Sequence, residues 1–347
     1  MAYTDIDKPS DYFNTVLWTG DGTTKDITGV GFQPDLVWAK KRSAAGYHAW
    51  CDVVRGGTKT IFSNASIAEE TSAVDWILSF ASDGFGVNSA GNLNQSSATY
   101  VAWNWLASNT TASNTDGSIT STVSANTTSG FSIVSYTGNG SAGATIGHSL
   151  GVAPSMFIIK NRSSGTTDWA VYNKNLGSGN KLLLNSSASS SASSYFNSTS
   201  PTSTVFSVND SDTSNGSGNS MIAYCFAEKK GFSKFGSYVA NADNNGPMIY
   251  LGFKPAFVII KRTSNSNPWI LLDNKRGSYN VNQSKLYPDN TDAENTDTSN
   301  GIDFLSNGFK IRRNNTEING ASGDTFIYIA FAENPFVTST GIPACAR

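Results

Sequence analysis

The sequence predicts an all-β protein made of three tandem jelly-roll-like β-sandwich domains from an internal triplication. Three observations lead to this prediction. A phrase of a proline, an apolar strand and a lysine occurs three times, as PDLVWAK, PSMFIIK and PAFVIIK. The landmarks around each copy keep the same order. The segments between them are rich in Ser, Thr, Asn and Gly, which favour turns over helices because their side chains bond to their own backbone or release it from steric limits.

The repeated phrase is typical of a core strand. Its copies begin at Pro34, Pro154 and Pro255, which gives a unit of roughly 100 to 120 residues. Four apolar residues with many β-branched and aromatic side chains predict a strand buried on both faces. A proline can begin such a strand because its missing N–H removes no ladder bond there.

Four further landmarks accompany each copy in the same order. An aromatic residue and a turn precede the phrase; a tryptophan with an apolar run, a short β-like segment and an alternating strand follow it. In chain order the copies read LWTGDG, SYTGNG and SYVANADNNG; AWCDVVRGG, DWAVYNKNLG and PWILLDNKRG; DGFGV, STVFSV and NGFKI; YVAWNW, MIAYCFAE and YIAFAE. This agreement predicts three copies of one unit.

The last strand of each unit alternates large and small side chains. In YIAFAE the small Ala330 and Ala332 lie between the bulkier Ile329 and Phe331. Because successive side chains in a strand point to opposite faces, one face is bulky and the other small. The small face would let a second sheet or a neighbouring chain approach closely.

The expected division of the chain follows from these landmarks. One short helix is expected around ASIAEETSAVDW, from Ala65. A unit of roughly 100 residues is large enough for a two-sheet sandwich. The segments are an N-terminal arm (1–12), repeat 1 (13–108), a Ser/Thr-rich linker (109–130), repeat 2 (131–229), repeat 3 (230–336) and a C-terminal tail (337–347).

Composition argues against several classes of partner. The chain has 24 Lys+Arg, 26 Asp+Glu and a net charge of -2, so it offers no basic field for nucleic acid or anionic lipid. No apolar run is long enough to predict membrane insertion. Three scattered cysteines predict neither a disulfide scaffold nor a zinc cluster, and Cys51 and Cys225 lie in apolar runs typical of a core.

Candidate contact residues come from the tryptophans and from positions that recur. Exposed tryptophans can stack on sugar rings, although core filling explains them equally well. The candidate surface or ligand contacts are Trp50, His48, Trp169 and Trp269. The repeated strand-end positions are Lys40, Lys160, Lys261, Glu228 and Glu333. We interpret the lysines as caps that reach solvent, with three equivalent lysine-lined sites as the alternative, and the glutamates as partners of a nearby Lys or Arg.

The sequence predicts no catalytic residue, metal site or cofactor. The two histidines, His48 and His148, are not accompanied by the GxSxG elbow of a hydrolase. For a carboxylate pair, Asp75 and Asp83 are the acids to test. The acidic loops NDSDTSNG and PDNTDAENTDTSNG lack EF-hand spacing, so we interpret them as solvated loops, with calcium binding left open.

The chain resembles a group of proteins encoded by marine bacteriophages, including podoviruses of cyanobacteria and other marine bacteria. The resemblance is carried by KPSDYFNTVLWTGDGTTKDITGVGFQPDLVW from Lys8 to Trp38, by YVAWNW, and by the terminal YIAFAENPFVTSTGIPACAR. It implies a virion structural protein, usually labelled a tail fibre or a protein of unknown function. It carries no catalytic residues.

From the resemblance we expect a non-enzymatic virion surface protein, assembled in the host bacterial cytoplasm and carried on the tail for host recognition or attachment. Its partners would be other virion proteins and a host cell-surface glycan, with homotrimers a guess from virion symmetry. The leading arm is the expected attachment surface. The alternatives are a capsid decoration or head-fibre protein, and a tail spike that binds or degrades polysaccharide.

Overall fold

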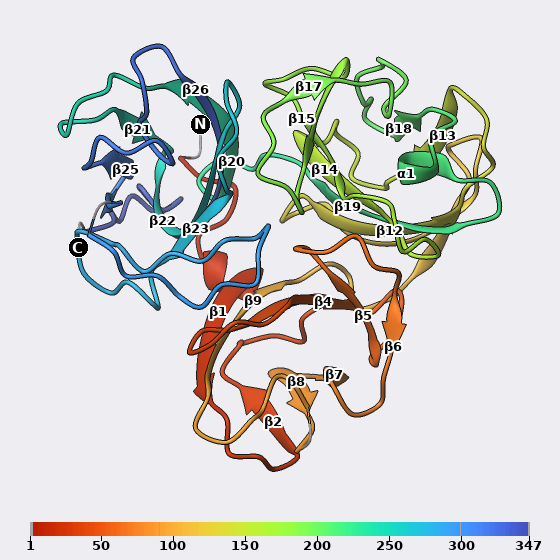
Figure 1. Ribbon diagram of the computed structural model, residues 1–347, viewed down its shortest axis with the longest axis horizontal. Helices are drawn as coiled ribbons and strands as arrows, with labels where there is room; N and C mark the ends of the chain where they lie inside the picture. The colour runs from red at the N-terminus through yellow and green to blue at the C-terminus, as the bar shows by residue number, and fades with distance from the viewer. Residues whose placement is uncertain (1–2, 90, 299, 346–347) are drawn as a thin grey trace.

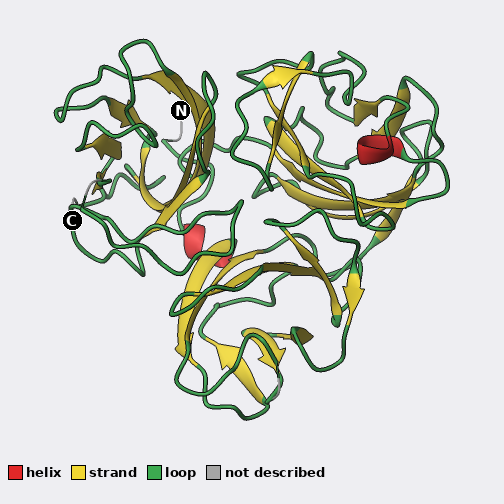
Figure 2. Cartoon of the chain, in the orientation of Figure 1, coloured by secondary structure: helices red, strands yellow, loops and turns green. Residues whose placement is uncertain are grey.

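The computed structural model describes residues 3–89, 91–298 and 300–345. Figure 1 shows three β-rich lobes around a common centre, and Figure 2 shows that strands and loops make up nearly the whole chain. The all-β prediction is confirmed. Among the described residues, no helix is long and apolar enough to cross a membrane.

Lobe 1 contains a large and a small antiparallel sheet. The large sheet has the order β1-β9-β3-β4-β5-β6, and the small sheet has the order β2-β8-β7. The strands are β1 Phe13–Thr19, β2 Lys25–Thr28, β3 Leu36–Lys41, β4 His48–Asp52, β5 Lys59–Phe62, β6 Glu70–Thr71, β7 Ile77–Ala81, β8 Gly84–Val87 and β9 Thr99–Trp105.

Lobe 2 repeats this arrangement and extends it at one edge. Its large sheet has the order β10-β11-β12-β19-β14-β15-β16-β17, and β13 pairs with β18. The strands are β10 Ala112–Asn114, β11 Ser121–Asn126, β12 Phe131–Thr137, β13 Ala144–Gly147, β14 Met156–Asn161, β15 Ala170–Asn173, β16 Asn180–Leu183, β17 Ser191–Ala192, β18 Val205–Val208 and β19 Ser220–Phe226.

Lobe 3 has the same order with fewer strands. Its large sheet is β20-β26-β22-β23 and its small sheet is β21-β25-β24. The strands are β20 Ser233–Val239, β21 Met248–Tyr250, β22 Phe253–Arg262, β23 Ile270–Asp273, β24 Ile302–Leu305, β25 Gly308–Ile311 and β26 Thr325–Pro335. In every lobe the closing strand (β9, β19 or β26) therefore lies between the strand that begins the repeat (β1, β12 or β20) and the strand of the repeated phrase. That internal triplication produced this recurrence stays an interpretation of the sequence.

The repeated phrase forms a strand buried on both faces, as expected. In β3, Leu36 and Trp38 face the middle of the molecule, whereas Val37 and Ala39 face the core between the two sheets of lobe 1. The closing strand behaves in the same way. In β26 the bulky Ile329 and Phe331 face the middle, and the small Ala330 and Ala332 pack inside lobe 3, where they let the second sheet approach.

A central core joins the three lobes. The closing strands β9, β19 and β26 place one aromatic residue each at equivalent positions in this core, namely Trp105, Phe226 and Phe331. Each of the three pairs with the residue two positions after the proline of the repeated phrase. Their ring centroids are 6.4 Å apart for Trp105–Phe226, 6.0 Å for Phe226–Phe331 and 5.6 Å for Trp105–Phe331. The lobes are thus faces of one closed body as well as sandwiches with their own cores.

The N-terminal arm is part of this body. Ile6 is 4% exposed and belongs to the central core. The Asp5 N–H donates to the Lys230 carbonyl at 3.0 Å, so the arm lies along the connection between lobes 2 and 3. A short 3-10 helix, η1 Pro9–Asp11, then leads into β1.

Three local expectations are corrected. The helix expected around ASIAEETSAVDW is absent there; the segment contains β6 instead, and the helix α1 spans Asp212–Asn215. The expected linker 109–130 contains β10 and β11, which extend the large sheet of lobe 2. Pro255 lies inside β22, at an irregularity in its pairing with β26, where a missing N–H is tolerated.

Candidate functional site

The three repeated lysines lie at the junctions between lobes. Each is 0% exposed, so the prediction of solvent-reaching caps is wrong. The side-chain ammonium of Lys160 donates to the Ser66 carbonyl of lobe 1 at 2.9 Å, that of Lys40 to the Thr291 carbonyl of lobe 3 at 3.2 Å, and that of Lys261 to the Ser187 carbonyl of lobe 2 at 2.9 Å. The three bonds form a ring: lobe 2 to 1, lobe 1 to 3, and lobe 3 to 2.

Burial lowers the pKa of each of these lysines to about 8. The amine is still protonated at neutral pH, where it donates to two carbonyls and loses its water. Lys160 also donates to the Thr167 carbonyl at 2.8 Å, and Lys261 to the Asn267 carbonyl at 2.6 Å. Because one carbonyl belongs to the lysine's own lobe and the other to a facing loop, each lysine holds loops of two lobes together, and none of the three is exposed to line an open site.

A backbone bond repeats beside each lysine. The Glu69 N–H donates to the Arg162 carbonyl, the Ser190 N–H to the Thr263 carbonyl, and the Glu294 N–H to the Arg42 carbonyl. These pairs follow the same ring of lobes. The contact between neighbouring lobes therefore includes one equivalent backbone bond in all three places.

The candidate aromatic contacts are all interior. His48, Trp169 and Trp269 are 0% exposed and Trp50 is 1% exposed, so none presents a ring to solvent. The structure also changes their alignment. The backbone N–H groups of His48, Trp169 and Trp269 donate to Asn64, Asn185 and Asp289, respectively, which makes His48 rather than Trp50 the lobe 1 equivalent.

His48 is held as a neutral acceptor. Trp38 Nε1 donates to its Nδ1 at 3.0 Å. Burial lowers the pKa of His48 well below its usual value, and the nearby charges of Lys40 and Arg276 lower it further. The other histidine, His148, is also buried, and its Nδ1 accepts from the Leu150 N–H at 3.2 Å. Both imidazoles are engaged in the packing of the fold.

Two junctions carry ionic clusters that are partly buried. Between lobes 2 and 1, Glu69 accepts two bonds from Arg162, at 2.7 and 2.8 Å, and one from Arg55 at 3.1 Å. Between lobes 1 and 3, Glu294 accepts bonds from Arg42 at 2.8 and 2.9 Å and from Arg276 at 3.0 Å. These arginines hold the pKa of both glutamates below the usual value despite their burial.

Each cluster continues to an aspartate and to an aromatic group of the neighbouring lobe. Asp52 pairs with Arg55 and accepts the Tyr224 hydroxyl at 2.7 Å. Asp273 pairs with Arg276 at 2.6 Å and accepts Trp103 Nε1 at 2.9 Å.

The third junction is neutral at these positions. Asn173 and Leu176 replace the aspartate and arginine, and Ser190 and Thr263 replace the glutamate and arginine. Ile329 stands at the place of Tyr224 and Trp103. Two junctions therefore contain an ionic cluster, and the third, the neutral junction, has uncharged residues at the equivalent positions, with the Lys261 ammonium beside them. Because a buried ion pair offsets its own desolvation only with good geometry, the neutral junction can be about as stable as the charged ones.

The recurring glutamates behave as expected. Glu228 pairs with Lys174 at 2.7 Å, and Glu333 pairs with Lys254 at 3.3 Å. The acids considered for glycoside chemistry are turn acceptors. Asp83 accepts the N–H groups of Gly29 and Gly31, which lower its pKa, and Asp75 accepts the Ser72 hydroxyl at 2.6 Å. In the described part of the chain, no three His, Cys, Asp or Glu residues are grouped so that they could hold a metal ion.

A cleft of about 750 Å³ lies between lobes 2 and 3 beside the N-terminal arm. Tyr3 and Tyr250 line it and are 65% and 55% exposed. The ammonium of Lys234 lies 5.4 Å from the centre of the Tyr250 ring. Lys174, Lys229, Lys230 and Lys234 line the cleft with only Asp5 and Glu228 as acids, so it is basic in a chain of net charge -2.

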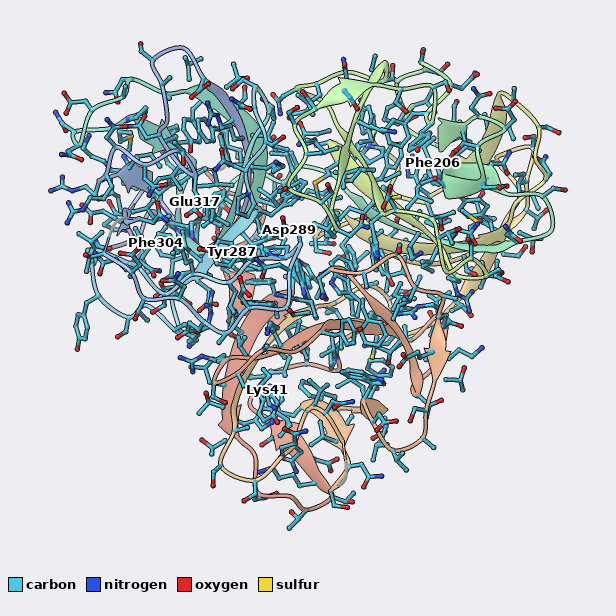
Figure 3. The ribbon with its side chains drawn as sticks, viewed as in Figure 1. Lys41, Phe206, Tyr287, Asp289, Phe304 and Glu317 are labelled. Atoms are coloured by element: carbon cyan, nitrogen blue, oxygen red, sulfur yellow. The ribbon has the colours of Figure 1, made fainter. Side chains whose placement is uncertain are left out.

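A second cleft, of about 620 Å³, lies in lobe 3 and is acidic. It is lined by Tyr287, Asp292, Glu294, Asp297 and Glu317, three of them from the acidic loop that follows Pro288. Figure 3 shows Tyr287 and Glu317 within lobe 3, with Asp289 nearer the middle of the molecule. Sequence reasoning missed both clefts and the ionic clusters, because each joins residues from distant segments.

A family model described as a domain of unknown function (DUF7483) matches residues 8–335. No curated protein and no solved structure matches the chain.

Proposed function

Because the chain belongs to the DUF7483 family, whose description gives no activity, we propose its role from its own sequence and geometry. The protein is a non-enzymatic surface protein of a bacteriophage virion, carried on the tail for recognition of or attachment to the host. The location rests on the resemblance of residues 8–38 and of the C-terminal segment to marine phage proteins.

The closed ring of lobes is the observation that carries the proposal. The side chains best suited to chemistry are buried: His48 is engaged with Trp38 inside lobe 1, and the lysines at positions 40, 160 and 261 make contacts that fix one lobe to the next. Such a body presents polar loops from a rigid scaffold, which is the arrangement that binding proteins use.

Attachment to the virion is assigned to the side of the N-terminal arm. The arm is fixed by the bond from Asp5 to Lys230, beside the basic cleft between lobes 2 and 3. A partner with an acidic surface would fit this side.

The capsid is the second candidate location. Three lobes around one centre fit a threefold position on a capsid as well as a trimeric tail part, so the closed ring supports either location. The homotrimer expected from virion symmetry stays a prediction. One chain already supplies three lobes around a centre. A single copy could therefore occupy a threefold position in place of a homotrimer.

The experiment that tests host recognition is competition for adsorption. Host cells are incubated with the purified full-length protein and then challenged with the phage that encodes it, with heat-denatured protein as the control. The proposal expects slower adsorption in proportion to the native protein added. Unchanged adsorption, together with no binding of the protein to the cells, would contradict it.

A further inference from the structure

Lobe 1 contains a compact pocket in addition to the two clefts described above. Its volume is about 220 Å³, and it is lined by Lys41, Ala45, Gly46, Tyr47, Glu70, Trp76, Asn92 and Leu93. The volume is below the roughly 300–1,000 Å³ of sites for drug-sized ligands, so it suits a single small ring. Figure 3 shows Lys41 within lobe 1.

One wall of the pocket is an aromatic platform. Tyr47 is 42% exposed, and its ring packs on Phe62 with centroids 4.8 Å apart. Phe62 in turn packs on Trp76, again at 4.8 Å. Trp76 is only 4% exposed, so the exposed tyrosine ring is supported from behind by two buried aromatic rings.

The platform is fixed before any ligand arrives. The Gly46 N–H donates to the Thr291 carbonyl of lobe 3 at 2.8 Å, and the His48 N–H donates to Asn64 at 2.8 Å. Tyr47 is thus held between two anchored neighbours. Fixing a binding group in advance reduces the entropy that binding must offset.

The polar groups of the pocket suit hydroxyl groups. Glu70 Oε2 accepts Trp76 Nε1 at 3.2 Å, which orients the carboxylate. Asn92 is exposed, and its backbone is fixed by a bond to the Asp75 carbonyl at 2.8 Å. The carboxylate of Glu70 and the ammonium of Lys41 carry opposite charges, so the pocket has no net charge with which to attract an ion.

We propose that this pocket binds a neutral monosaccharide unit, with its C–H face on Tyr47 and its hydroxyls on Glu70 and Asn92. A pyranose has one apolar face and a rim of hydroxyls, which matches an aromatic wall beside a carboxylate and an amide. The inference deepens the proposed function, because it names the chemical class that the protein would recognise on a host.

The corresponding position in lobe 3 differs. Pro268 precedes Trp269 as Tyr47 precedes His48, and it lines the acidic cleft of that lobe. The exposed aromatic platform is therefore absent at this place in lobe 3. The carboxylates that line the cleft of lobe 3 would also repel sugars that carry a carboxylate. The proposal concerns lobe 1 alone.

Saturation-transfer difference NMR tests the proposal on the purified full-length protein. The probes are the methyl glycosides of glucose, galactose, mannose and N-acetylglucosamine, with methyl glucuronide as the charged comparison. We expect at least one neutral glycoside to receive saturation on its ring C–H protons, with a Kd on the order of 1 mM. Tyr47→Ala should weaken binding by about tenfold or more, because it removes the platform.

Three variants separate ligand contact from folding. Tyr47→Phe keeps the ring and should keep the binding, whereas Glu70→Gln should weaken it several-fold. Tyr279→Ala removes a tyrosine that is 83% exposed and does not line the pocket, so binding should be unchanged. Binding by none of the neutral glycosides, tighter binding of the glucuronide, or an equal loss in Tyr279→Ala would each overturn the proposal.

The result is independent of where the protein sits on a virion. Sugar binding that is lost in Tyr47→Ala, together with unchanged phage adsorption, would support the pocket and contradict host recognition. In the opposite outcome, the Tyr47→Ala protein slows phage adsorption as much as the wild type does, and neither protein binds a sugar. That result would support host recognition and overturn the proposed sugar pocket.

Discussion

Tyr224 of lobe 2 donates its hydroxyl to Asp52 of lobe 1 at 2.7 Å, across a junction where both side chains are buried. The same carboxylate holds Arg55, and Arg55 holds Glu69. A single tyrosine hydroxyl of one lobe thus completes the ionic cluster of the next.

Tyr224→Phe tests this relationship. The variant leaves a buried carboxylate with one donor fewer, and hydrogen bonds to charged groups are the stronger ones, so the free energy of unfolding should fall by about 2 kcal/mol. Tyr136→Phe is the matched control, because its hydroxyl bonds the neutral Ser214 carbonyl within lobe 2 at 2.6 Å. It should lose about 1 kcal/mol. Urea denaturation measures both, and a loss below about 0.5 kcal/mol in Tyr224→Phe would contradict the role given to the bond.

The neutral junction provides a template for the charged ones. Arg55→Leu leaves the buried Asp52 and the half-buried Glu69 without their shared cation, with Asp52 then lacking any cation, so we expect a loss of about 3 kcal/mol. Changing Asp52→Asn, Arg55→Leu, Glu69→Ser and Arg162→Thr together copies four of the five positions of the junction between lobes 3 and 2, with Tyr224 kept, and should recover most of that loss. Equal instability of the single and the fourfold variant would contradict the equivalence of the junctions.

Asp289 gives a prediction for the dependence of stability on pH. Burial raises its pKa from 3.8 to about 6. A carboxyl group that binds its proton more tightly when folded contributes most below its unfolded pKa, and this contribution is lost as the pH rises through about 6. Stability from this group should therefore decline between about pH 4 and pH 7.

Asp289→Asn should remove that decline. The equivalent residues in lobes 1 and 2 are Asn64 and Asn185, and their amide oxygens accept the same backbone bond. The variant should gain about 1 kcal/mol at neutral pH, after the lost attraction to Lys261 is counted. Thermal melts across this pH range measure the effect, and Asn185→Asp is the reverse control, which should lose stability at neutral pH. A loss of stability in Asp289→Asn at neutral pH would sink the explanation.

The buried lysines should resist chemical modification. With a pKa of about 8, Lys40, Lys160 and Lys261 would be more reactive than ordinary lysines if reagent could reach them. Their complete burial predicts the opposite. After brief acetylation of the native protein near neutral pH, peptide mass spectrometry should find these lysines unmodified and the exposed Lys275 modified. Modification of all of them at equal rates would show that the junctions open readily.

The shared core predicts one cooperative unfolding transition. Trp105, Phe226 and Phe331 come from different lobes and touch one another, so no lobe can unfold without exposing rings of the other two. Calorimetry should give a calorimetric enthalpy equal to the van't Hoff enthalpy. Trp105→Ala should cost about 3–5 kcal/mol and lower the single transition as a whole. Separate transitions for the lobes would contradict a common core.

The strands could be predicted from the sequence, but the packing of the three lobes into a closed ring could not. The repeated phrase and the alternation in YIAFAE follow from local patterns, and the structure places both as expected. The junctions depend on residues far apart in the chain, such as Lys261 and Ser187, which no local pattern connects. A lysine that ends an apolar strand normally reaches water. The loop of lobe 2 that covers Lys261 is polar like the other loops, so its composition does not show that it packs against this lysine.

The prediction that the tryptophans and His48 contact a ligand at the surface was wrong for a related reason. A tryptophan has the same local signature in a core as on a rim, so Trp169 and Trp269 could not be placed by sequence. Tyr47 carried a weak signal, because it follows a glycine in a loop and precedes a buried strand. Its support by Phe62 and Trp76 depends on the fold of lobe 1.

Cryo-electron microscopy of the virion that encodes this chain tests the proposed role most directly. We predict density for the closed three-lobed body at the tail, with the side of the N-terminal arm against the particle and the lobe 1 pocket exposed. Density of this shape on the capsid lattice, or its absence from the purified particle, would contradict the assignment to host recognition.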